Sequence, residues 1–153
     1  MTESSSNNKD DNEIDIKIPP NSVEAEQSIL GGLMLDNSAW DKIADIIVKS
    51  DFYRKDHQII FDGISSLIES AEACDVVTLS EYLDNKGNLD SVGGLEYLAT
   101  LANETAGSAN VVSYAKILRE RSVLRSLIAA GNEISGSAFS TEGRPASELV
   151  DQA

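Results

Sequence analysis

The two side chains best suited to catalysis occur once each in this sequence. His57 is the single histidine and Cys74 the single cysteine. An imidazole can act as a general base and a thiol as a nucleophile, but neither residue lies in a nucleophile elbow of the G-x-S-x-G type. We therefore interpret His57 as a surface or helix-cap histidine and Cys74 as a small packed thiol. These counts also exclude the common zinc sites and an internal disulfide.

Motifs that hold nucleotide phosphates are absent as well. The sequence contains neither G-x-x-x-x-G-K-[ST] nor G-x-G-x-x-G. Gly31-Gly32 could approach a phosphate, but no G-K-[ST] follows it. We therefore expect no catalytic residue, no metal and no bound cofactor in this segment, and no ATP hydrolysis by it.

Acidic residues dominate the charge of the chain. There are 26 aspartates and glutamates against 12 lysines and arginines, which gives a net charge of −14 over 153 residues. Such a surface repels phosphate backbones, so we expect weak binding to single-stranded DNA and favour a protein-binding module. One stretch is basic and admits two interpretations, a phosphate contact or a charged rim that pairs with acids of a neighbouring subunit. The net charge favours the rim, whose basic residues are Lys116, Arg119, Arg121 and Arg125.

Hydropathy divides the chain into a polar tail and a folded part. Residues 1–17 are polar and acidic, which predicts a disordered tail. With 41% hydrophobic and 25% charged residues, the chain as a whole has the composition of a globular protein. No apolar run approaches the roughly 20 residues of a membrane span, and the polar N-terminus does not resemble a secretory signal. We expect a cytoplasmic protein with no membrane contact.

Apolar residues recur at helical spacing along the whole folded part. The short β-branched pair Val76-Val77 is thin evidence for a strand, so we predict an all-α fold. Asn21 with Glu24, and Thr78 with Glu81, have the spacing of capping boxes at two helix starts. Gly31-Gly32 would weaken a helix, so we expect another backbone to pack against it. The predicted helices cover approximately residues 23–34, 40–47, 55–70, 78–87, 94–103 (with Leu95, Leu98 and Leu101 inward) and 108–139.

The last of these helices is too long for the domain that precedes it. A helix of about 28 residues within this segment is roughly 42 Å long, which overhangs a core of shorter helices. A turn at residues 143–145 and the apolar pair Leu149-Val150 then predict a second, antiparallel helix. We therefore predict a globular helical head at 18–107 and a helical hairpin at 108–153, with an apolar stripe that binds another subunit or a partner. Because the pattern stops within the second helix, we expect more protein to follow.

Several blocks of sequence occur together and in order. They are IPPNSVEAEQSILGGLMLD at 18–36, DFYR at 51–54, HQIIF at 57–61, LDSVGGLEYL at 89–98, and AN at 109–110 leading to LRER at 118–121. In this combination residues 18–153 resemble the N-terminal domain of bacterial replicative DNA helicases of the DnaB type. The first 17 residues carry no part of the resemblance.

The resemblance implies a helical head and hairpin, followed beyond residue 153 by an ATPase that uses ATP and magnesium. It also implies hairpins that pair between subunits, a hexameric collar built as a trimer of dimers, and docking of the C-terminal domain of primase. A helicase loader is a further implied partner, and single-stranded DNA would be held only by the complete ring, which unwinds DNA 5′ to 3′ at the replication fork in the bacterial cytoplasm. A stand-alone helical adaptor or loader-like protein is the alternative. Carried over by position, the implied partner-binding residues, for primase or for the dimer interface, are Glu24, Tyr97, Leu124, Ile128, Ile134 and Leu149.

Overall fold

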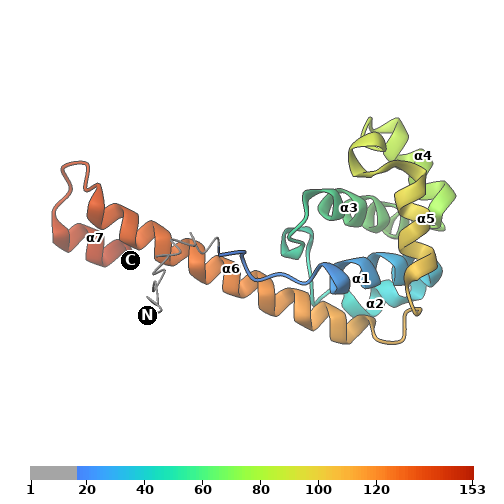
Figure 1. The fold of residues 1–153 in the computed structure, drawn as a ribbon, viewed down its shortest axis with the longest axis horizontal. Helices are drawn as coiled ribbons and strands as arrows, with labels where there is room; N and C mark the ends of the chain where they lie inside the picture. The colour runs from blue at the N-terminus through green and yellow to red at the C-terminus, as the bar shows by residue number, and fades with distance from the viewer. Residues whose placement is uncertain (1–16) are drawn as a thin grey trace, which may run out of the picture.

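The computed structural model describes residues 17–153 as a helical head with a long projecting arm (Figure 1). No β-strand occurs among these residues, so the predicted all-α class is confirmed. The predicted disorder of the tail concerns residues that, apart from Lys17, lie outside the described part. The α-helices are α1 (Val23–Leu35), α2 (Trp40–Ile43), α3 (Lys55–Glu69), α4 (Val76–Asn85), α5 (Gly94–Glu104), α6 (Val111–Phe139) and α7 (Ala146–Gln152), and short 3-10 turns lie at Asn37–Ala39, Lys49–Asp51 and Asp90–Val92.

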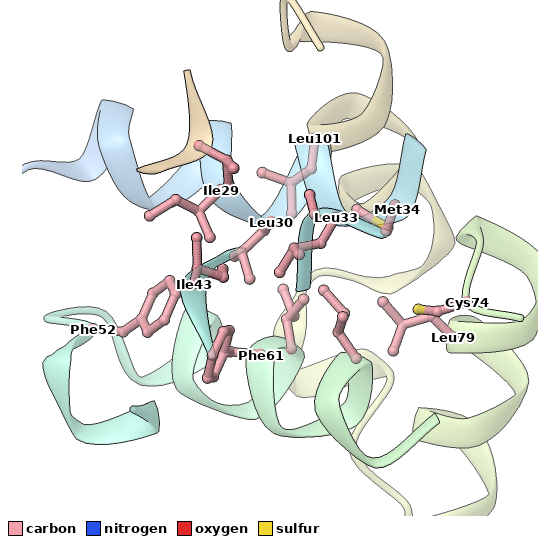
Figure 2. Close-up of a cluster of buried hydrophobic side chains, with 14 of the residues drawn as sticks. Ile29, Leu30, Leu33, Met34, Ile43, Phe52, Phe61, Cys74, Leu79 and Leu101 are labelled. Carbon is pink, nitrogen blue, oxygen red and sulfur yellow. The ribbon is translucent and has the colours of Figure 1, made fainter. Parts of the chain in front are cut away.

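Helix α1 lies at the centre of the head. Its residues Ile29, Leu30 and Leu33 are fully buried. Figure 2 shows them in one apolar cluster with Phe52 and Phe61, whose rings lie 4.8 Å apart between centroids. Because α1 is covered by α3, α5 and the start of α6, its apolar residues occur on nearly every side of the helix rather than on one stripe.

The glycine pair of α1 lies where two other backbone segments of the head approach this helix closely. A Cβ placed on Gly31 would lie 2.1 Å from the carbonyl oxygen of Leu101 in α5. One placed on Gly32 would lie 3.3 Å from the carbonyl oxygen of Gly107, in the loop before α6. The expected close approach of another backbone is therefore confirmed at both positions.

The predicted helix starts are displaced from the observed ones. The cap of α1 is Ser22, whose hydroxyl accepts from the Ala25 amide, whereas the Asn21 side chain donates to the Pro19 carbonyl. The cap of α4 is Asp75, which pairs reciprocally with Thr78 at the third helical position. Both capping-box predictions were therefore wrong in their cap residue, because Ser and Asp occupy the position at which the helical hydrogen bonds begin.

Two further sequence expectations do not match the head. The predicted second helix is a 3-10 turn followed by the four residues of α2, because the chain turns after Ile43 instead of continuing to Ile47. Leu95, expected inward, is half exposed at the start of α5, whereas Leu98 and Leu101 are buried as expected.

Helix α6 belongs to the head at its start and leaves it afterwards. Val111, Ala115 and Leu118 are buried, and no later residue of α6 is. In Figure 1 the helix passes along α1 and α2 and then projects away from the head, and α7 lies beside its far end. We call residues 126–153 the arm. None of the helices in the described part of the chain is long and apolar enough to cross a membrane.

Candidate protein-interaction surfaces

Helix α6 carries a stripe of exposed apolar side chains that begins at residue 123 and continues into the arm. At 100° per residue these positions fall within a sector of about 160° on α6, on the side opposite the buried residues Val111, Ala115 and Leu118. Their exposed fractions run from 38% to 91%. Such a contiguous apolar face is typical of a protein contact. The stripe consists of Val123, Leu124, Leu127, Ile128, Ile134 and Phe139.

A groove of about 400 Å³ separates the far end of α6 from α7. Ile134 from α6 and Leu149 from α7 both line it, together with Glu133 and Arg144. Arg144 fixes the hairpin by donating from Nη1 to the Gln152 side-chain oxygen at 2.7 Å. Ile134 therefore lies at the edge where the stripe meets the groove. Ile128 is on the stripe but does not line the groove. Six residues along a helix place the two isoleucines about 120° apart around the axis.

A second groove, of about 260 Å³, lies on the head between α1 and α5. The exposed Glu24 lines it with Glu104 and Thr100. Tyr97 is near by on α5 and is partly buried, with the Arg54 guanidinium 5.5 Å from its ring centroid. The carried-over residues thus occupy three places. Glu24 and Tyr97 lie on the head, Leu124 and Ile128 on the middle of α6, and Ile134 and Leu149 at the hairpin.

The head contains a buried polar network that the sequence did not reveal. Glu26 of α1, 1% exposed, accepts from the backbone amides of Tyr53 at 3.0 Å and Arg54 at 3.3 Å. The same carboxylate lies 2.8 Å from Nδ1 of His57, whose Nε2 lies 2.6 Å from the hydroxyl of Tyr97. The carboxylate thereby joins α1 to the start of α3, and His57 joins α3 to α5.

The interpretation of His57 as a surface or cap residue was wrong, since its side chain is fully buried. Both ring nitrogens are engaged, so the imidazole offers no free nitrogen to a substrate. At the start of α3, burial of Asp56 opposes its ionisation, but the hydrogen bond from Arg54 (Nε to Oδ1, 3.0 Å) and the neighbouring charges outweigh it, so the Asp56 pKa lies below its usual value. The network therefore links the helices α1, α3 and α5 within the head.

The basic stretch of α6 contacts its own chain. Arg119 donates to the buried Asp51 carboxylate at 2.8 Å, and Arg125 donates to the backbone carbonyls of Pro20 and Asp51 at 2.7 and 2.8 Å. Both arginines thus have acceptors within their own chain, and the predicted pairing of the basic rim with acids of a neighbouring subunit stays a prediction. Within residues 17–153, the side chains of Lys116 and Arg121 make no hydrogen bond or ion pair.

Cys74 is buried, as expected, and its burial should make the stability of the chain depend on pH. Burial, with a smaller contribution from the Asp75 charge, raises the pKa of the thiol from 9.0 to about 12. Between these values the unfolded chain has lost a proton that the native chain keeps, so stability falls as the pH rises. We expect unfolding in urea at pH 10.5 to show a Cys74-dependent loss of about 1–2 kcal/mol relative to pH 8. Cys74→Ala should lack this part, and equal losses in both proteins would contradict the assignment.

Comparison with known proteins matches both the sequence blocks and the fold. Residues 18–120 match the family model of the DnaB-like helicase N-terminal domain. The chain belongs to this DnaB-like helicase N-terminal domain family. The replicative DNA helicase DnaB of Haemophilus influenzae is 41% identical over 138 residues, which is 90% of this chain and 30% of that helicase. The chain thus spans about a third of the length of this curated relative.

Solved structures show the same DnaB-type fold. The N-terminal domain of DnaB helicase from Mycobacterium tuberculosis superposes with a TM-score of 0.85 at 37% identity, covering 88% of this chain and 94% of that one. A DnaB-like replicative helicase solved with its interactions with primase gives a TM-score of 0.66 at 20% identity, covering 85% of this chain and 31% of that one. This second similarity concerns the fold alone.

Proposed function

We propose that this chain is the assembly and primase-docking domain of a replicative DNA helicase. The observation that carries the proposal is the apolar stripe on α6, which neither the head nor α7 covers. A second copy supplies a matching stripe, and two hairpins together can bury faces that one hairpin leaves exposed. Assembly of dimers into a hexameric collar is the proposed outcome.

Primase is the second proposed partner. The DnaB-like helicase of similar fold was solved with its interactions with primase, which supports a corresponding contact in this family. In this chain the contact is proposed for the C-terminal domain of primase at Ile134 and Leu149 in the hairpin groove, with Ile128 on the stripe and Glu24 and Tyr97 on the head. A helicase loader is a further proposed partner of the same domain.

The activity proposed for the whole protein belongs outside these 153 residues. The relatives are replicative DNA helicases about three times as long, and the present sequence has no P-loop. We assign ATP, magnesium and 5′ to 3′ unwinding to an ATPase domain, and contact with single-stranded DNA to the assembled ring in the bacterial cytoplasm. The net charge of −14 supports a role as a protein platform rather than a DNA-binding surface.

Ile134→Asn and Ile128→Asn should each weaken binding of the primase C-terminal domain at least about tenfold. Each change removes apolar contact worth about 1.5–3 kcal/mol and buries an amide in the complex. Titration calorimetry measures the affinity, and helical circular dichroism checks that the head remains folded.

Ser126→Asn is the matched control, because it places the same amide about 200° around α6 from Ile128. It should bind primase like the parent. If both isoleucine variants also bind like the parent, the hairpin is not the docking surface.

A further inference from the structure

One arginine holds the base of the arm against two separate segments of the head. Arg125 Nη1 donates to the carbonyl of Pro20, in the extended stretch before α1, at 2.7 Å. Its Nη2 donates to the carbonyl of Asp51 at 2.8 Å, and its guanidinium lies 5.5 Å from the centroid of the Tyr53 ring. A planar guanidinium can bond the two carbonyls with separate nitrogens while its face lies over the ring, whereas an ammonium group has one nitrogen and no flat face.

Arg125 lies well beyond the part of α6 that is buried in the head. Leu118 is the last buried residue of the helix, and Arg125 lies seven residues further on, about 10 Å along the axis. The intervening Arg119 is bound to Asp51, which is itself buried and accepts the Val48 amide at 2.8 Å. The direction of α6 beyond Leu118 therefore depends on polar contacts to the loop at residues 48–53 rather than on apolar packing.

We propose that Arg125 is a clasp that sets the direction in which the arm leaves the head and that can open without unfolding it. Its acceptors are two backbone carbonyls, one of the partly buried Pro20 and one of the buried Asp51, and its own side chain is only partly buried. Opening it breaks two hydrogen bonds and one stacking contact, and the buried residues Val111, Ala115 and Leu118 keep the first part of α6 in the core. Release leaves the arm free to pivot near Leu118. The clasp acts whether or not the arm binds primase.

Arg121 provides a matched comparison on the same helix. It has the same side chain one turn earlier, and within residues 17–153 it makes no hydrogen bond or ion pair with the head. If any long cation on this part of α6 stiffened the arm through packing alone, replacing Arg121 would have an effect similar to replacing Arg125.

The test is a distance distribution between head and arm in the 153-residue chain. Spin labels are attached to cysteines introduced at Glu69, at the exposed end of α3, and at Ser140, after α6. The buried Cys74 stays in place, and the labelling stoichiometry checks that it has not reacted. Excess unlabelled chain suppresses distances between copies, and pulsed electron paramagnetic resonance measures the distribution for the parent, R125A, R125K and R121A.

The clasp predicts one narrow distribution for the parent and for R121A, and a distribution about twice as wide for R125A, as a released hinge gains a domain-scale motion. R125K should resemble R125A, because lysine cannot bond both carbonyls while stacking on Tyr53. Helical circular dichroism checks that each variant is folded. If R125A loses helix, the width of the distance distribution of R125K decides the test instead. Parent-like widths in the folded Arg125 variants, or equal broadening by R121A, would overturn the proposal.

Discussion

An alanine at Gly31 is expected to lower the free energy of unfolding of the head by about 3 kcal/mol or more. The added Cβ would lie 2.1 Å from the Leu101 carbonyl oxygen, which belongs to the α5 backbone and cannot rotate away as a side chain could. Relief requires α1 and α5 to separate, and this loosens the apolar contacts on both sides of the crossing. Urea unfolding followed by circular dichroism measures the loss.

Gly136→Ala separates this steric effect from the helix propensity of alanine. Gly136 also lies within a helix, but nothing stands within 4 Å of its Cβ position. Alanine there should be neutral or stabilise by up to about 1 kcal/mol, because glycine is the poorer helix former. A Gly31→Ala protein as stable as the parent would mean that α1 and α5 do not cross as closely as described.

Glu26→Leu is expected to destabilise the head by about 4 kcal/mol. Leucine fills a similar volume, but it leaves the amides of Tyr53 and Arg54 and the Nδ1 atom of His57 without their acceptor in a buried site. Each buried donor without a partner costs about 1–3 kcal/mol, and only part of this is regained by burying the apolar side chain. Chemical unfolding measures the loss.

Two milder changes show whether the network is the cause. Glu26→Gln keeps one acceptor oxygen and should lose less than Glu26→Leu. Glu24→Gln, two residues earlier on the exposed face of α1, should change stability by no more than about 0.5 kcal/mol. Equal losses for Glu26→Leu and Glu24→Gln would show that charge at the start of α1, rather than the buried hydrogen bonds, controls stability.

The sequence predicted those features that depend on local spacing. The apolar periodicity placed α3 at 55–70 against the observed Lys55–Glu69, and it indicated the long helix that became α6. Gly31-Gly32 indicated the close approach of another backbone, because two glycines otherwise only weaken a helix. The hairpin followed from the turn before Pro145, because proline fits the start of a helix.

Features that depend on distant partners were not predictable in the same way. His57 is buried because Glu26, 31 residues earlier, and Tyr97, 40 residues later, lie beside it in the fold. The sequence suggested that Arg119 and Arg125 form a surface rim, because Asp51, to which both donate, lies more than 60 residues away in the chain. A signal existed for the last case, since a basic cluster in a chain of charge −14 has many acidic residues of the same chain as possible partners.

Sedimentation equilibrium of the chain over a range of concentrations tests most directly whether the apolar stripe is an interface. The account predicts reversible association of the parent, association at least about tenfold weaker in Ile134→Asn, which corresponds to a loss of about 1.4 kcal/mol, and parent-like association in Ser126→Asn. A chain that remains monomeric at every concentration, or an Ile134→Asn variant that associates like the parent, would contradict the central claim that this stripe binds a second copy.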